Sequence, residues 1–168
     1  DTTGVDGFRL DAVKHISAWF FPQWLDALEQ HAQKKLFVVG EYWEGEMQSL
    51  VWYLDRLGGR SKAFCVPLHY RFHEASNDGG YDLRRLLDDT VTKARPEDVV
   101  TFVDNHDSQP LQALESPVAS WFKPLAYATI LLRREGYPCV FHPDYFGADY
   151  EDVGRDGQRH RVHLPSNK

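Results

Sequence analysis

Three acidic residues lie in segments whose composition suggests proton transfer or nucleophilic attack. Asp11 follows Arg9 by two residues in VDGFRLDAVKH, Glu41 ends the apolar run LFVVGE, and Asp107 lies in FVDNHDSQP. A carboxylate can act as a nucleophile, and a carboxylic acid can donate a proton. One such acid alone is explained equally well as a helix cap. Three of them, among aromatic residues and histidines, favour chemistry.

The first segment pairs a cation with an acid. In an extended strand, Gly7, Arg9 and Asp11 share one face, while Phe8 and Leu10 share the other. The apolar pair can pack against helices, so the face with Arg9 would point toward the interior of a barrel. An arginine one pleat away favours the charged form of Asp11, which a nucleophile requires. A structural ion pair is the alternative interpretation.

Glu41 has different neighbours. Five residues of low polarity precede it, and Tyr42 and Trp43 follow it. Apolar surroundings favour the neutral form of an acid, which can then donate a proton near neutral pH. One acid held charged and one held protonated is the pair that retaining hydrolysis of a glycosidic bond needs.

The elements that must position these acids alternate along the chain. Apolar runs predict strands, and apolar residues at helical spacing predict helices between them. The expected strands are 5–11, 36–41, 62–67, 99–105 and 138–142, and the expected helices are 16–32, 46–57, 69–76, 82–92 and 118–134. This pattern predicts an α/β fold with a parallel sheet or part of a barrel, in which residues at the C-terminal ends of strands build the active site.

Composition narrows the function classes. The net charge of the 168 residues is −6 with no basic run, which argues against nucleic-acid binding. No apolar run approaches the roughly 20 residues of a membrane span. Cys65 and Cys139 follow no CxxC pattern and are expected to be reduced and buried, with a disulfide between them as the alternative. Histidines 69, 73, 142, 160 and 163 show no metal-ligand spacing, so most are expected at the surface or in loops.

The motifs GFRLDAVKH, GEYW and FVDNHD resemble the second, third and fourth signature regions of the α-amylase family, glycoside hydrolase family 13, in the same order. Flanking text such as VPLHYRFHEAS, WFKPLAYA and GYPCVFHPDYFGADYEDVGRDGQ is similar to bacterial liquefying and cytoplasmic α-amylases. The resemblance covers essentially the whole chain.

The resemblance implies a role for each matching residue. Asp11 would be the nucleophile, Glu41 the general acid/base, and Asp107 the acid that stabilises the transition state. The other positions would contact the substrate: Arg9, Lys14, His15, Tyr42, Trp43 and His106. The backbone carbonyl of His15 would also bind a structural Ca²⁺, whose other ligands would come from outside this sequence. His15 as a helix-start residue and Trp43 as a core residue are the alternatives.

The resemblance also implies a domain organisation. Residues 1–142 would form strands four to eight of a (β/α)8 TIM barrel, and residues 143–168 a long surface loop after the last strand. The remaining barrel strands and a C-terminal β domain would be absent. Five strands cannot close a barrel, so the isolated chain is expected to be unstable or to aggregate.

The expected activity is retaining endohydrolysis of α-1,4 bonds in starch, glycogen or maltodextrins, with an α-glucan as the partner and no nucleic acid or membrane. A transglycosylase or α-1,6-acting enzyme is the first alternative, and a catalytically incompetent fragment that still binds glucan is the second. At Pro143 the sequence resembles the cytoplasmic rather than the secreted type of the family, so a cytoplasmic location is expected and a secreted one is the alternative.

Overall fold

The computed structural model describes residues 4–168, which divide into two compact units. The first unit comprises the residues up to Pro67 together with Asp88–Val100 and Glu135–Tyr137. The second comprises Leu68–Leu87, Thr101–Arg134 and Pro138–Lys168.

Strands and helices alternate along the described chain, as the sequence predicts. In chain order the elements are β1 (Gly7–Leu10), η1 (Val13–His15), α1 (Phe20–Ala32), β2 (Phe37–Gly40), α2 (Met47–Leu57), β3 (Lys62–Phe64), α3 (Val66–Asn77), η2 (Leu83–Arg85), α4 (Val91–Ala94), η3 (Pro96–Asp98), β4 (Val99–Phe102), α5 (Lys123–Leu132), β5 (Tyr137–Cys139), α6 (His142–Phe146), β6 (Ala148–Val153) and β7 (Arg159–Leu164).

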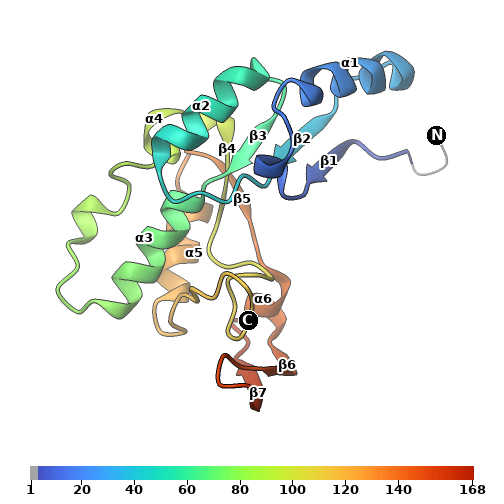
Figure 1. The fold of residues 1–168 in the computed structure, drawn as a ribbon. Helices are drawn as coiled ribbons and strands as arrows, with labels where there is room; N and C mark the ends of the chain where they lie inside the picture. The colour runs from blue at the N-terminus through green and yellow to red at the C-terminus, as the bar shows by residue number, and fades with distance from the viewer. Residues whose placement is uncertain (1–3) are drawn as a thin grey trace. The chain divides into compact units, whose positions relative to one another are not determined.

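Five of the strands in the described residues form one sheet, whose spatial order β1-β2-β3-β4-β5 is also their order in the chain (Figure 1). The pairs β1–β2, β2–β3 and β3–β4 are parallel. Parallel neighbours need a crossover connection, and the helices between the strands supply it. The expected parallel α/β arrangement is therefore confirmed.

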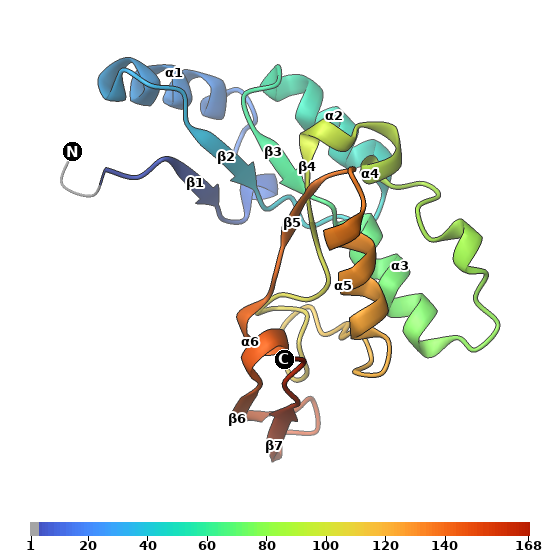
Figure 2. The same cartoon turned by 180° about the vertical axis from the view of Figure 1, so that it is seen from behind.

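Two helices cover the sheet in the first unit. Figure 1 and Figure 2 both place α1 and α2 on the same side of β1–β3. Phe21 of α1 packs with Tyr53 and Leu57 of α2 and with Val13 of η1 in a buried cluster. The helix α1 begins at Phe20 rather than at residue 16, so Pro22 lies in its first turn, where a missing N–H costs nothing.

The segment 82–92 is not one helix. It contains η2, capped by the Asp82 side chain, and the start of α4, capped by the Thr90 side chain. Between them Asp89 has φ 54°, a left-handed conformation that interrupts a right-handed helix. The polar residues in this stretch satisfy local backbone groups instead of extending one helix.

The tail 143–168 is also more ordered than expected. In place of a long loop it completes α6 and forms an antiparallel hairpin of β6 and β7, with Ala148 opposite Leu164 and Val153 opposite Arg159. Residues along β6 alternate between half-buried and exposed, a pattern typical of a strand with one covered face. The Tyr150 hydroxyl donates to the Pro110 carbonyl at 2.6 Å, so the hairpin packs on the segment after β4.

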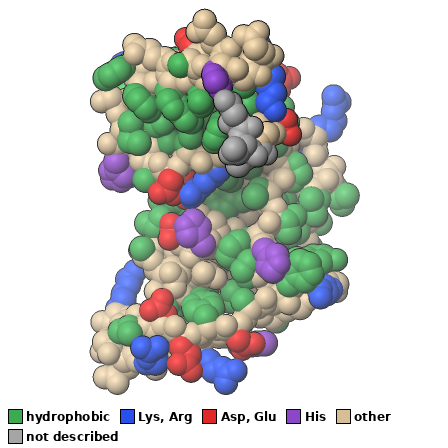
Figure 3. Space-filling view, turned by 90° about the vertical axis from the view of Figure 1, so that its right-hand side faces the viewer, with side chains coloured by type: hydrophobic (Ala, Val, Ile, Leu, Met, Phe, Trp, Pro, Cys, Tyr) green, Lys and Arg blue, Asp and Glu red, His purple; other side chains and the backbone are tan. Residues whose placement is uncertain are grey.

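Apolar side chains lie on the surface around β1. Val5, Trp19, Phe20 and Phe37 are each at least 40% exposed. Figure 3 views the side on which β1 lies and shows hydrophobic side chains gathered in its upper half. Such a surface supports the expectation of aggregation, which stays a prediction. Within the described residues, no helix combines the length and apolar character required to cross a membrane.

Both cysteines are reduced, as expected, although Cys139 is only half-buried. Most of these histidines lie at the surface, as expected, but His69 is fully buried in α3. Its Nδ1 donates to the Val103 carbonyl at 2.6 Å, and its Nε2 lies 2.9 Å from the Ser116 hydroxyl. Burial lowers the pKa of His69 to about 4 despite the contact with Val103.

The lowered pKa of His69 predicts a pH-dependent stability. The unfolded chain binds a proton at this histidine below about pH 6.5, whereas the folded chain does so only below about pH 4. The free energy of unfolding should therefore fall by about 3 kcal/mol as the pH drops through this window, and no further below it. In the full-length protein, the free energy of unfolding measured with urea should change less with pH in His69→Gln than in the wild type between these pH values. His163→Gln, at an exposed position, is the control; an equal change in both variants would contradict the assignment.

A second prediction concerns the close approach of β1 and β2. A Cβ atom on Gly7 would lie 2.0 Å from the Phe37 carbonyl oxygen, which is backbone and cannot rotate away. Gly7→Ala should therefore lower the free energy of unfolding by about 1–3 kcal/mol, the usual cost of overpacking. Gly79→Ala is the matched control, because nothing lies within 4 Å of a Cβ there. Equal unfolding midpoints for the two variants would refute this reason for the glycine.

Candidate active site

Parallel pairing brings the ends of β1 and β2 to one edge of the sheet. Leu10 is in register with Gly40, so the next residues, Asp11 and Glu41, leave the sheet side by side. The ladder continues past the strands, because the Glu41 N–H donates to the Leu10 carbonyl at 2.8 Å and the Val13 N–H donates to the Glu41 carbonyl at 3.1 Å. Both acids therefore emerge from a fixed backbone.

One guanidinium bridges these two acids. Nη1 of Arg9 lies 2.5 Å from Oδ1 of Asp11, and Nη2 lies 2.6 Å from Oε1 of Glu41. The planar fork of an arginine suits two carboxylates at once. The sequence predicted only the first of these contacts. Glu41 thus has a cationic partner as well as its apolar neighbours.

The two acids differ in exposure. The Asp11 side chain is 70% exposed, whereas that of Glu41 is 9% exposed. A buried structural ion pair, the alternative weighed for Arg9 and Asp11, does not describe so exposed a carboxylate. Asp11 is accessible to a ligand from solvent, while Glu41 also receives the Ala12 N–H at 3.4 Å.

The turn after β1 carries Lys14 and His15. Ala12 has φ 46°, which redirects the chain into η1. Nζ of Lys14 donates to the Trp43 carbonyl at 3.0 Å and lies 3.6 Å from Oε2 of Glu44, so in this structure it fastens η1 to the segment after β2. The side chain of His15 is exposed.

The two aromatic residues after Glu41 are half-buried. The Tyr42 ring lies 4.8 Å from the ring of Tyr53 and packs against the core cluster of the first unit. Tyr42 therefore contributes one face to packing. The substrate contacts expected for Tyr42 and Trp43 stay predictions.

Asp107 and His106 belong to the second unit, in the turn after β4. The Asn105 side chain accepts the N–H groups of Asp107 and Ser108 at 3.0 and 2.8 Å and so shapes the turn. Nε2 of His106 lies 3.4 Å from Oδ2 of Asp107. Within this unit the structure pairs His106 with Asp107, as it groups Arg9, Asp11 and Glu41 within the other.

A buried ion network, absent from the sequence-based predictions, lies beside this turn. Nζ of Lys123 is 2.9 Å from Oδ2 of Asp104 and also pairs with Oδ1 of Asp144. Burial raises the pKa of both carboxyls. Burial alone would lower the pKa of Lys123, but the carboxylates outweigh it and the pKa is raised. The signal in the sequence was a lysine inside the otherwise apolar run WFKPLAYATILL.

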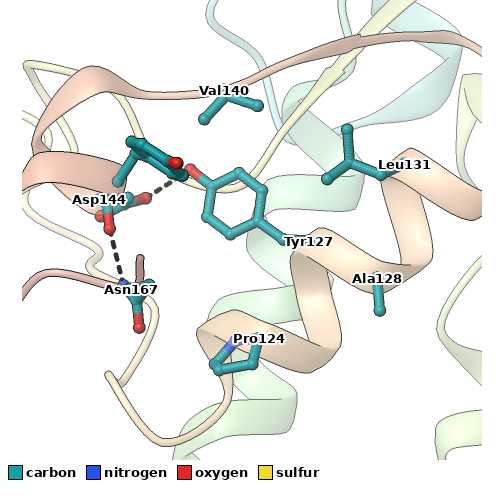
Figure 4. A pocket seen from close by; sticks show the side chains of 8 residues that line it. Pro124, Tyr127, Ala128, Leu131, Val140, Asp144 and Asn167 are labelled. Atoms are coloured by element: carbon teal, nitrogen blue, oxygen red, sulfur yellow. Dashed lines mark hydrogen bonds between the residues drawn. The ribbon is translucent and has the colours of Figure 1, made fainter.

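A cavity of about 400 Å³ borders the network on the side of Asp144 (Figure 4). Most of its lining is apolar, and no candidate catalytic residue points into it. The lining residues are Pro124, Tyr127, Ala128, Leu131, Val140, Asp144, Tyr145 and Asn167.

Metal ligands do not gather in the described part of the chain. The described residues contain no group of three or more His, Cys, Asp or Glu side chains that could hold a metal ion. The backbone carbonyl expected from His15 is one oxygen, whereas Ca²⁺ takes six to eight. The residues present do not by themselves make a calcium site.

Comparison with curated proteins gives consistent relatives. The chain is 52% identical over 166 residues to the cytoplasmic α-amylase of Escherichia coli K12, covering 98% of this chain and 34% of that protein. It is 53% identical over 148 residues to an α-amylase of Geobacillus stearothermophilus, covering 88% and 27%. It is 48% identical to the glucan 1,4-α-maltohexaosidase of Bacillus sp. strain 707 over 148 residues, covering 88% and 29%. The chain thus spans about a third of the length of these relatives.

Solved structures agree on the fold. An α-amylase of Geobacillus thermoleovorans, solved with acarbose, superposes with a TM-score of 0.64 at 23% identity over 83% of this chain and 32% of that one. An Anoxybacillus α-amylase gives a TM-score of 0.62 at 21% identity over 84% and 32%. No protein-family model matches the chain.

The similarity to these proteins agrees with the strand order of the sheet and with the place of the three motifs beyond the ends of its strands. The five strands are part of a TIM barrel, as expected. The chain is homologous to one segment of the bacterial α-amylases of glycoside hydrolase family 13.

Proposed function

We propose that the protein carrying this chain hydrolyses α-1,4-glucosidic bonds within starch, glycogen or maltodextrins, with retention of the anomeric configuration. The observation that carries the proposal is the Arg9 guanidinium between an exposed Asp11 and a buried Glu41. Two carboxyl groups with different environments, close to one another, are the requirement of double displacement.

In the first step, Oδ of Asp11 attacks the anomeric carbon while Glu41 donates its proton to the departing glycosidic oxygen. A covalent glycosyl ester forms on Asp11, and the shortened glucan leaves. In the second step, Glu41 accepts a proton from water, and the resulting hydroxide displaces Asp11. Arg9 contacts both acids, so it compensates the carboxylate charge that shifts between them.

The remaining residues bind sugar in this proposal. Asp107 would accept hydrogen bonds from sugar hydroxyls and stabilise the cationic transition state, and His106 beside it would bind the same ring. A second set would contact the leaving-group side of the glucan or stack on its rings: Lys14, His15, Tyr42 and Trp43.

Transglycosylation is the second candidate. A cyclomaltodextrin glucanotransferase of Bacillus sp. strain 6.6.3 is 28% identical over 171 residues, covering 97% of this chain and 22% of that protein. The two reactions share the glycosyl-enzyme and differ in whether water or a sugar hydroxyl accepts it. The 52% identity to an α-amylase favours hydrolysis.

Two further properties stay proposals. A cytoplasmic location is supported by the name of the Escherichia coli relative, and the secreted type is the alternative. Structural Ca²⁺ is supported by the family alone, because the described residues contain no cluster of metal ligands.

The central prediction concerns the two acids. In the full-length protein, Asp11→Asn should remove the nucleophile and Glu41→Gln the proton donor. Each should lower kcat on soluble starch by at least about 10²–10⁴-fold, the usual contribution of such groups. Asp6→Asn is the matched control, because Asp6 is an exposed partner of Lys34 before β1. A reducing-sugar assay measures the rates.

Product analysis completes the test. Proton NMR of the first products should show the α-anomer, and a rise in the β-anomer first would mean inversion. Near wild-type kcat in either acid variant would contradict the mechanism. Cyclic or lengthened products from maltodextrins would favour the transglycosylase instead.

A further inference from the structure

The ammonium of Lys123 lies where two chain segments leave the sheet. Lys123, Asp104 and Asp144 are each at most 6% exposed. Asp104 follows β4, and Asp144 belongs to α6, which follows β5. Asp144 is held further by the Tyr127 hydroxyl at 2.6 Å, and its backbone carbonyl accepts from the Asn167 side chain (Figure 4).

A chain of hydrogen bonds leads from this ion network to Asp107. The Ser108 hydroxyl donates to Oδ1 of Asp104 at 3.2 Å and accepts the Asn105 N–H at 2.9 Å. The Asn105 side chain in turn accepts the Asp107 N–H. The Asp107 carbonyl accepts the Leu114 N–H at 3.1 Å, so the backbone of Asp107 is fixed on both sides.

The negative charge of Asp104 fixes which group donates and which accepts in each of these hydrogen bonds. An ionised carboxylate is an acceptor only, so it must receive the Ser108 proton and leaves the hydroxyl oxygen to accept from Asn105. The Val118 N–H also points at both Asp104 oxygens at 3.3 Å. Without the ammonium, two buried carboxylates would remain uncompensated, and at least one would take up a proton.

We propose that Lys123 is a positioning residue: by pairing with Asp104 it orients Ser108 and Asn105, and through them holds the turn that presents Asp107 to the substrate. This inference rests on the function proposed above. A cation buried between two acids often stabilises a protein no better than apolar residues would. Lys123 lies beside the turn that carries Asp107, so its pairing can position that residue in addition to any effect on stability.

The test is a double-mutant cycle in the full-length protein with Lys123→Met and Ser108→Ala. Lys123→Met should lower kcat on starch by roughly 10–100-fold with a smaller change in KM, because Asp107 acts mainly in the transition state. Ser108→Ala removes only the hydroxyl that connects Asp104 to Asn105 and leaves the ion network in place. The double variant should be hardly slower than Lys123→Met, since coupled residues are not additive. Lys93→Met removes an exposed lysine from a surface pair with Asp88 and should leave kcat unchanged.

Hydrogen exchange supplies a readout that does not depend on activity. In Lys123→Met the amides of Asp107 and Ser108 should exchange at least about 10-fold faster, while those of α2 in the other unit keep their rates. Wild-type exchange at Asp107 and Ser108, or additive effects in the cycle, would overturn the positioning role. An inactive wild-type enzyme would instead overturn the proposed function, and the exchange measurement would still decide the role of Lys123.

A variant without unpaired charge covers the case in which Lys123→Met does not fold. A triple variant, Asp104→Asn/Lys123→Met/Asp144→Asn, removes all three charges together. A buried network tolerates this change better than the loss of one partner, because no charge is left uncompensated. We expect it to fold and to show the same fast exchange at Asp107. Wild-type exchange and kcat in this triple variant would count against the proposal.

Discussion

The parallel pairing of β1 with β2 is the constraint on which the candidate active site depends. Leu10 opposite Gly40 sets the two chains so that Asp11 and Glu41 emerge together. A shift of one residue would turn every side chain of a strand to its other face. Gly7 permits this register because the Phe37 carbonyl occupies the space that a Cβ would need. The glycine therefore serves the close approach of two backbones.

Each unit uses the same electrostatic device, one cation shared by two carboxylates beyond the ends of strands. Arg9 joins Asp11 and Glu41 in the first unit, and Lys123 joins Asp104 and Asp144 in the second. The two differ in burial. Arg9 and Asp11 are accessible and can respond to a substrate, whereas every charge around Lys123 is buried. The first arrangement suits chemistry, and the second suits the support of a loop.

Ordinary packing surrounds both arrangements. Tyr42, Tyr53 and Phe21 form an aromatic group behind the candidate active site in the first unit. In the second unit, His69 stacks on Phe102 and bonds to the carbonyl of Val103, just before Asp104. Close-packed interiors of this kind hold neighbouring side chains to within a fraction of an ångström, as an active site requires.

Local sequence determined the features that depend on nearest neighbours. The apolar runs gave the five strands within one to three residues, and the motif order gave the family and the three acids at strand ends. Predictions from the length and polarity of a segment were wrong where tertiary contacts or the conformation of a single residue decide its structure. The segment 82–92 broke at Asp89, and the polar tail formed a hairpin because Tyr150 and its neighbours found partners on the segment after β4.

Only the tertiary structure decided which charges meet. Arg9 pairs with Glu41 as well as with Asp11, and Lys123 lies between Asp104 and Asp144. These contacts join residues 19 to 32 positions apart in the chain. No spacing in the sequence encodes such distances, since they follow from strand register and from the docking of α5 onto its unit. The sequence by itself determined the chemistry that is available, because residue types carry it. The fold determined how that chemistry is compensated, because Coulomb energy depends on distance through space.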